Sequence, residues 1–253
     1  MTSTFLSKVK SGKQVKPPRL MILGAPGVGK STFAAGAPDV LFIDCERRTE
    51  HLDVRRLDAT SWEEVLGTLR EVCALGKKSD APCKTLVVDT VDHLEALIQA
   101  HVCKANGWSS MEEPGYGKGY NIALEEWRTF VKAIEALRDV GITVVLLAHA
   151  AIRMYSNPGG ADYDQWMLKL TKGAAALLRE KVDATGFAAF EDASKAKFDR
   201  KGDQITRGKA ETTGRRVLYF GHNPAYETKL GLGLPDEMDL EWSSLQEVLD
   251  NGK

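Results

Sequence analysis

The sequence predicts an α/β fold with a mainly parallel central sheet flanked by helices and with antiparallel strands near the C-terminus. Three observations support this prediction. Short apolar runs alternate with segments of helical periodicity along most of the chain. A glycine-rich phosphate-binding motif stands between the first apolar run and the first helical segment. Turn-forming residues then separate short strand-like runs near the C-terminus, which is typical of antiparallel strands.

The first half of the chain is expected to form three buried strands and three helices. Gly36 and Pro38 break the first helix early, and Ser61 with Glu64 forms a capping box that begins the second. In order, the predicted elements are a strand at 20–23, a short helix, a strand at 40–43, a helix after Ser61 through about Leu75, a strand at 85–88 and a helix from about 92 to 105.

The second half continues the alternation and then changes to antiparallel strands. Its predicted elements are a glycine-rich loop at 108–120, a helix at about 122–140, a strand at 142–147, a loop at 151–165, a helix at about 173–181, a strand near 183–190, antiparallel strands with turns at Gly202 and Asn223-Pro224, and a last short helix capped by Ser244 and Glu247.

Length and composition indicate a protein that buries a substantial core, since 43% of its 253 residues are hydrophobic. No apolar stretch is long enough to span a membrane and no secretory leader follows Met1, so we expect a cytoplasmic protein without a membrane partner. The cysteines form no CxxC pair and are expected to be reduced thiols.

The chain is expected to consist of a basic N-terminal arm (1–18), a core (19–240) and a short C-terminal helix (241–253). A net charge of −1 excludes a global attraction to polyanions, so nucleic-acid binding would depend on local patches. Two basic segments are visible, the arm and residues 195–216. Such segments are as often solvated faces as binding surfaces.

A complete P-loop follows the first apolar run. Its glycines let backbone N–H groups surround a phosphate, Lys30 supplies a positive charge for the β- and γ-phosphates, and the Ser31 hydroxyl can ligate Mg²⁺. The sequence therefore predicts that the chain binds a nucleoside triphosphate with Mg²⁺. The predicted nucleotide-binding residues are Gly24, Ala25, Pro26, Gly27, Val28, Gly29, Lys30, Ser31 and Thr32.

Three further polar residues stand at or just beyond the ends of predicted strands. Asp89 ends the third strand and is expected to hold Mg²⁺ beside Ser31. Glu46 follows the second strand, where a general base could orient the attacking water. His149 follows the fourth strand at the same edge of the sheet, where the γ-phosphate would lie. A surface salt bridge for Glu46 and a satisfied core position for His149 are the alternatives.

Taken together, these motifs resemble the RecA recombinase core over about residues 18–240. The shared features are Phe-Ile-Asp-x-Glu after the P-loop helix, Leu-Val-Val-Asp-Thr-Val in the metal-binding strand and a polar residue ending the next strand. In detail, the motif sequences look most like those of the phage-encoded, core-only "AAA" nucleotide-binding proteins, which include the Sak-type single-strand annealing recombinases. This closer resemblance rests on Tyr116–Tyr120, on Leu147–Ala150, and on Tyr226–Lys229 followed by Gly233-Leu234-Pro235.

The resemblance implies a RecA-type P-loop ATPase that uses ATP and Mg²⁺, with Lys30 on the phosphates, Glu46 as the base and His149 as the γ-phosphate sensor. It also implies a homo-oligomer with ATP at the subunit interfaces. Relatives complete the neighbouring subunit's ATP site with a basic pair. This chain keeps only Lys229 of that pair, because Gly231 stands at the second position. We therefore expect weak or DNA-dependent hydrolysis.

The resemblance further implies that single-stranded DNA contacts two loops, at 108–120 and 151–165. Both loops combine aromatic faces with cations, as sequence-tolerant single-strand binding requires. Acidic residues in both loops weaken this argument, and the aromatic residues could instead anchor a subunit interface. The residues expected to contact DNA are Tyr116, Lys118, Tyr120, Arg153 and Tyr155.

The favoured hypothesis is a single-stranded-DNA-binding recombinase core of phage type, acting in the cytoplasm of a bacterial host. A single-strand-binding protein is a candidate accessory partner. The alternative is a RecA-fold ATPase that acts on protein partners as a loader or regulatory switch. A small-molecule kinase is disfavoured because no lid-like arginine cluster follows the metal-binding strand. A GTPase is disfavoured because the chain has no Asn-Lys-x-Asp motif.

Overall fold

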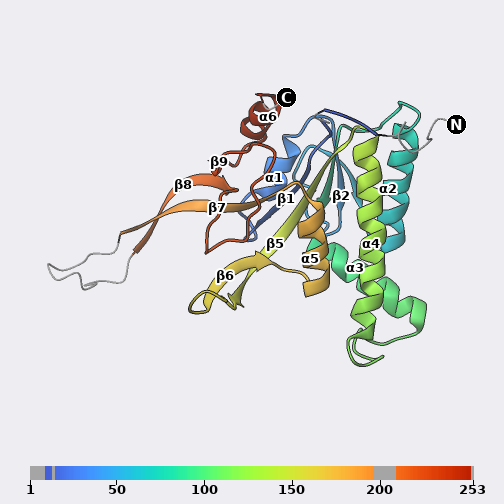
Figure 1. Ribbon diagram of the computed structural model, residues 1–253. Helices are drawn as coiled ribbons and strands as arrows, with labels where there is room; N and C mark the ends of the chain where they lie inside the picture. Colours follow the sequence, from blue (N-terminus) through green and yellow to red (C-terminus); the bar gives the residue numbers. More distant parts are fainter. Residues whose placement is uncertain (1–8, 13–14, 196–208, 252–253) are drawn as a thin grey trace.

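A nine-stranded sheet organises the computed structural model, which describes residues 9–12, 15–195 and 209–251 (Figure 1). Its strands are β1 (Arg19–Gly24), β2 (Val40–Asp44), β3 (Arg55–Asp58), β4 (Thr85–Asp89), β5 (Thr143–Tyr155), β6 (Tyr163–Leu168), β7 (Ala184–Lys195), β8 (Lys209–Tyr219) and β9 (Glu237–Asp239). The strand order is β3-β2-β4-β5-β1-β7-β8-β9, and β6 pairs with the outer part of β5.

The strands from β3 through β7 in this order are parallel, whereas β8, β9 and β6 pair antiparallel to their neighbours. The predicted fold class is thus confirmed. Because β5 lies between β1 and β4, the carboxyl ends of these three strands meet at one edge of the sheet. In open α/β sheets, this edge is where ligands bind.

Helices cover both faces of the sheet (Figure 1). One face carries α2 (Trp62–Gly76), α3 (Val91–Asn106), α4 (Lys118–Asp139) and α5 (Lys172–Lys181), and the other carries α1 (Lys30–Ala35) and α6 (Trp242–Asn251). Alternate residues of β1 face opposite layers, with Met21 and Leu23 under α2–α5 and Leu20 and Ile22 under α1 and α6. None of the described helices is long and apolar enough to cross a membrane.

The capping box was predicted correctly at its N-cap, because the Ser61 side chain accepts a hydrogen bond from the Glu64 backbone N–H at 3.2 Å. The last helix was predicted to be capped by Ser244, and this is wrong. Helix α6 begins at Trp242, which is buried against Phe33 with ring centroids 5.4 Å apart. Burial of the indole therefore extends the helix beyond the capping signal, and Ser244 lies in its first turn.

The helix predicted at about 122–140 begins earlier, at Lys118. Two features of the glycine run explain the difference. Gly117 has a positive φ of 70° at the N-cap, a conformation that other residues rarely adopt. A Cβ on Gly119 would lie 2.3 Å from the Met111 carbonyl oxygen, so this glycine lets the helix approach the preceding chain. Lys118 and Tyr120 therefore lie on α4 and not in a loop.

The loop predicted at 151–165 is largely a β-hairpin. Strand β5 continues past His149 to Tyr155 and returns as β6, with the rings of Tyr155 and Tyr163 5.1 Å apart across the pair. Cross-strand aromatic contact of this kind stabilises a hairpin. The turn-forming residues alone indicate only a loop. Strand β3 was not predicted, because its Arg-Arg-Leu-Asp sequence has no apolar run.

Near the C-terminus, the predicted turn at Asn223-Pro224 is present, with the Tyr226 N–H donating to the Asn223 carbonyl at 3.2 Å. The turn predicted at Gly202 and most of the basic segment 195–216 lie outside the described residues, as do residues 1–8 of the N-terminal arm.

Candidate active site

The P-loop joins β1 to α1 at the carboxyl edge of the sheet. Gly27 and Gly29 have positive φ values of 78° and 104°, which side chains with a Cβ disfavour. Lys30 is buried, and its Nζ donates to the carbonyl oxygens of Gly24 and Ala25 at 3.1 and 3.0 Å. Burial lowers the pKa of Lys30, although nearby carboxylates oppose this effect. Phosphate oxygens would offer this amine stronger, charged partners.

Ser31 and Asp89 form the pair expected for Mg²⁺. The Ser31 hydroxyl donates to Asp89 Oδ2 at 2.6 Å. Asp89 is buried, and burial raises the pKa of its carboxyl to about 6 against the opposing hydrogen bond from Ser31. A divalent cation would favour the charged form of this carboxylate, and hydroxyl and carboxylate oxygens are ligands that Mg²⁺ accepts. The residues present therefore fit a Mg²⁺ ion.

Asp44 shapes the loop that presents Glu46. The buried Asp44 carboxylate accepts hydrogen bonds from the backbone N–H groups of residues 46, 47, 48 and 49 and from the Thr49 hydroxyl. The Glu46 side chain is consequently held at the edge of the P-loop pocket and is 16% exposed. The sequence pattern predicts a role for Glu46 but does not indicate that the Asp44 carboxylate positions it.

His149 lies beside this carboxylate and is oriented by Asp92. His149 Nδ1 is 2.9 Å from Asp92 Oδ2, and the His149 backbone N–H donates to Asp92 Oδ1 at 3.0 Å. Burial alone would raise the pKa of Asp92, but these hydrogen bonds lower it well below its usual range. The charged carboxylate accepts from Nδ1–H, so His149 Nε2 is directed toward Glu46 Oε2, 3.9 Å away.

A cavity of about 280 Å³ joins these groups. It is lined by Lys30, Ser31, Glu46, Asp89 and His149 together with other P-loop residues and with Arg48, His51 and Thr90. Residues far apart in the sequence thus surround one space lined mainly by charged and polar groups. Of these, only Lys30 is cationic and buried, whereas Arg48 is largely exposed.

Arg216 on β8 is a phosphate-site candidate that sequence analysis did not single out. A Cβ on Gly29 would lie 2.5 Å from Arg216 Nη1, so the guanidinium contacts the P-loop. Among the described residues Arg216 forms no ion pair, whereas the adjacent Arg215 pairs with Glu191 and Asp239. Alternation along the strand sends the two arginines to opposite faces. Only the strand register reveals which of them meets the P-loop.

Lys229 lies away from the P-loop of its own chain. It pairs with Thr185 near the start of β7, whereas Gly24 of the P-loop pairs with Ala188 farther along the same strand. Lys229 Nζ donates to the carbonyl oxygens of Arg179 and Val182 at 3.0 and 2.5 Å, at the end of α5. Within one chain, Lys229 thus stabilises the C-terminal end of α5, toward the edge of the sheet opposite the P-loop.

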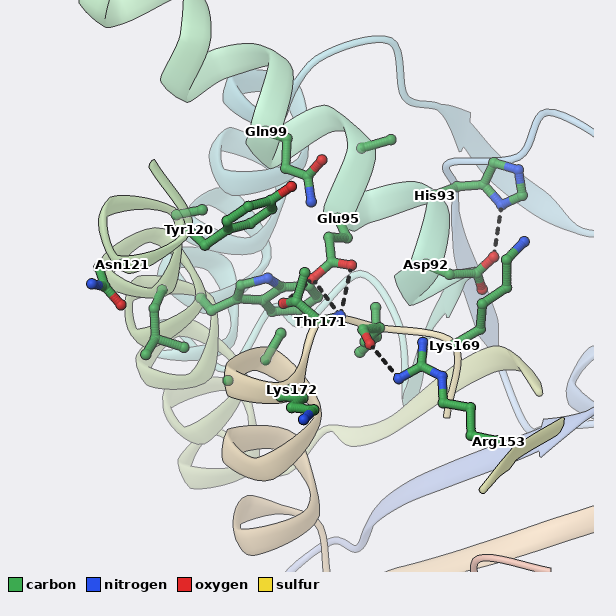
Figure 2. Close-up of a pocket in the computed structure, with 17 residues that line it drawn as sticks. Asp92, His93, Glu95, Gln99, Tyr120, Asn121, Arg153, Lys169, Thr171 and Lys172 are labelled. Atoms are coloured by element: carbon green, nitrogen blue, oxygen red, sulfur yellow. Dashed lines mark hydrogen bonds and ion pairs between the residues drawn. The ribbon is translucent and has the colours of Figure 1, made fainter. Parts of the chain in front are cut away.

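A second cavity, of about 800 Å³, lies between α3, α4, α5 and β5 (Figure 2). The structure brings Tyr120 and Arg153, two of the five expected DNA contacts, to its lining. The Arg153 guanidinium donates to the Leu170 carbonyl at 3.1 Å. Sequence analysis did not identify Lys169 and Lys172, which add two cations to the same lining.

The other three expected DNA contacts do not line this cavity. The side chain of Tyr116 is fully exposed, and Lys118 is exposed on the first turn of α4. Tyr155 contacts Tyr163 on the hairpin. These side chains are accessible but do not converge on one site with Tyr120 and Arg153.

A family model described as an AAA domain matches residues 16–230 of the chain. The matched region contains the P-loop, Glu46, Asp89, His149 and Lys229. None of the curated proteins matches the chain.

Proposed function

Because this chain belongs to the AAA domain family, we propose that it is an ATP-dependent, single-stranded-DNA-binding recombinase core that promotes annealing or strand exchange in phage recombination. An AAA-type ATPase domain is present, and its P-loop supports ATP as the nucleotide. Mg²⁺, held by Ser31 and Asp89, would neutralise charge on the β- and γ-phosphates. We expect the chain to assemble into homo-oligomers with ATP at the interfaces.

In the proposed hydrolysis, Lys30 exchanges its carbonyl partners for phosphate oxygens. Glu46 orients a water molecule for attack on the γ-phosphorus and accepts its proton as the bond to the β-phosphate oxygen breaks, giving ADP and phosphate. His149, held in one orientation by Asp92, contacts the γ-phosphate from the end of the parallel part of β5. The position of Glu46 beside His149 supports this arrangement.

The observation that supports DNA as the partner is the cavity in Figure 2. Tyr120 offers an aromatic face for a base, and Arg153, Lys169 and Lys172 offer charges for phosphates. Its main acids are already engaged: Asp92 binds His149, as described above, and Glu95 accepts hydrogen bonds from the Thr171 backbone and hydroxyl. Asp92 thus contacts both this cavity and the sensor of the nucleotide pocket.

A second candidate function is action on a protein partner. It is favoured by large apolar side chains exposed on two strands, namely Ile152 and Met154 on β5, 57% and 70% exposed, and Phe190 on β7, 45% exposed. Exposed apolar side chains grouped on one surface often mark protein contacts. In the proposed homo-oligomer, the same side chains would also suit a subunit interface.

The test is binding of a fluorescent oligothymidine, with and without ATP and Mg²⁺, over a range of salt concentrations. The logarithm of the affinity should fall linearly with the logarithm of salt as phosphate contacts release counterions. Replacing Tyr120 and Arg153 together by alanine should remove about 1–3 kcal/mol of binding for the stacked base and reduce the salt slope. Lys104→Ala, an exposed cation on α3 outside the cavity, is the matched control. Equal affinity of all three proteins would instead favour the protein-directed function.

A further inference from the structure

We propose that Glu46, His93 and His149 form a binding site for a divalent transition-metal ion such as Zn²⁺, separate from the Ser31–Asp89 pair. The three residues come from the loop after β2, the first turn of α3 and β5, and one donor atom of each lies within 4.8 Å of the others. Glu46 Oε2 is 3.9 Å from both His149 Nε2 and His93 Nδ1. Donors around tetrahedral Zn²⁺ lie roughly 3.4 Å apart, so small side-chain rotations would close the site.

The donor types distinguish this site from the Mg²⁺ site. Two imidazoles and one carboxylate suit Zn²⁺ or Co²⁺, and three protein ligands leave a position open for water or a phosphate oxygen. Ser31 and Asp89 offer only oxygen, which Mg²⁺ prefers. The two neighbouring sites would therefore select different ions from the same solution.

The Asp92 carboxylate already orients the His149 imidazole, whereas the His93 nitrogen nearest Glu46 would exchange a hydroxyl contact for the ion. Asp92 engages His149 Nδ1 at 2.9 Å and leaves Nε2 as the donor toward Glu46. Carboxylate contacts of this kind are typical of metal-binding histidines. Figure 2 shows His93 beside Asp92, and Thr90 Oγ1 lies 2.8 Å from His93 Nδ1. The Thr90 hydroxyl also hydrogen-bonds Asp92, so it keeps a partner when His93 turns to a metal ion.

The metal site would inhibit the nucleotide site, and this consequence rests on the proposed function. An ion bound to Glu46 occupies the carboxylate that is proposed to accept a proton from water. It also occupies His149 Nε2, the nitrogen that is proposed to contact the γ-phosphate. The His93 side chain is 41% exposed, so the site is open to ions from solvent. Zn²⁺ would act as a reversible inhibitor that leaves the P-loop itself accessible.

The first test uses Co²⁺ as a spectroscopic probe of the full chain without nucleotide or Mg²⁺. We expect one ion per chain with the visible ligand-field absorption of a low-coordinate site, and competition by Zn²⁺. His93→Ala should weaken Co²⁺ binding at least tenfold. His101→Ala should bind as the wild type does, because His101 lies two to three turns along α3 and contacts Glu63 instead. Equal affinity of His93→Ala and the wild type, or equal loss in both variants, would overturn the proposal.

The second test measures hydrolysis at fixed free Mg²⁺ and ATP while free Zn²⁺ is raised. Wild type and His101→Ala should be inhibited at the same free Zn²⁺. His93→Ala, compared with its own rate without Zn²⁺, should require at least tenfold more Zn²⁺ for the same fractional inhibition. Zn²⁺ that binds without slowing the wild type would overturn the inhibitory role. A chain that hydrolyses no ATP with Mg²⁺ alone would contradict the proposed function, and the Co²⁺ titration would still decide whether the metal site exists.

Discussion

Lys30 and Asp89 are buried charges whose pKa values are shifted toward their neutral forms by the same pocket, downward for the amine and upward for the carboxyl. Such shifts mark sites where a bound ligand supplies the missing counter-charge. A phosphate beside Lys30 and a cation beside Asp89 would each remove part of the unfavourable burial. At the scale of single residues, the pocket therefore suits the metal–polyphosphate ligand of the proposed function.

Arg216 gives the sharpest residue-scale prediction, because its neighbour provides a matched control. Arg216→Ala should weaken Mg²⁺–ATP binding roughly fivefold to tenfold, about 1–1.4 kcal/mol, since the lost contact with phosphate is charged but exposed to solvent. Arg215→Ala should leave ATP binding unchanged, because its guanidinium pairs with Glu191 and Asp239 on the other side of β8.

Competition against a fluorescent ATP analogue measures both affinities. An equal loss of ATP affinity in both variants, or no loss in either, would show that Arg216 does not contact the nucleotide. Its position could not be predicted from the sequence, where it belongs to one undivided basic run. By contrast, the positions of Lys30, Ser31 and Asp89 could be predicted, because the P-loop and an apolar strand ending in aspartate are local patterns.

At the scale of elements, sequence periodicity predicted the strands and helices whose hydrophobic residues lie in the core. Strand β4, for example, is completely apolar between Thr85 and Asp89 and is buried along its whole length. The sequence did not predict β3, whose residues are polar, or the β5–β6 hairpin, whose pairing depends on contacts between strands. Gly119, which the sequence pattern assigns to a loop, instead lies in α4, where the absence of a Cβ allows close packing against Met111.

The loop after β2 provides the element-scale prediction. Asp44→Asn replaces one carboxylate oxygen with an amide that cannot accept the buried N–H groups of residues 46–49. We expect a loss of about 2–3 kcal/mol in the free energy of unfolding, because hydrogen bonds to a buried charge are lost. Hydrolysis should fall more than ATP binding, because Glu46 is displaced while the P-loop remains intact.

Urea unfolding and steady-state turnover test this prediction. Asp58→Asn is the control, since Asp58 is exposed on β3 at the position paired with Asp44, and its unfolding free energy should change by less than about 0.5 kcal/mol. Unchanged stability and turnover in Asp44→Asn would mean that another interaction holds the loop.

At the scale of the whole molecule, the P-loop and Lys229 lie toward opposite edges of the sheet. Within one chain, Lys229 therefore does not reach the nucleotide, and its amine binds the end of α5. An assembly in which one subunit presents its Lys229 edge to the P-loop edge of the next would bring the two together. The proposed homo-oligomer requires such a head-to-tail contact.

Mixing variants tests this assembly. Lys229→Ala should hydrolyse ATP slowly, because the cation at the developing γ-phosphate charge is lost. Adding inactive Lys30→Ala subunits should restore hydrolysis, since each still offers Lys229 to an intact neighbouring P-loop. Lys181→Ala, a cation at the end of α5, should turn over as the wild type does. If the mixture never exceeds the sum of its components although the variants co-assemble, Lys229 acts only within its own chain.

Strand β5 has a mechanical consequence for such an assembly. It runs for 13 residues from the centre of the sheet to the exposed hairpin, with no glycine or proline within it, and His149 stands at its midpoint. A β-strand of this length spans roughly 40 Å, and its two halves are joined by continuous extended backbone. The sheet therefore supports one end of the strand, the hairpin forms the other end, and His149, the proposed γ-phosphate sensor, lies between them. In the proposed assembly, a neighbouring subunit or a DNA strand bound to the hairpin would pull on the same strand that carries His149 into the nucleotide pocket.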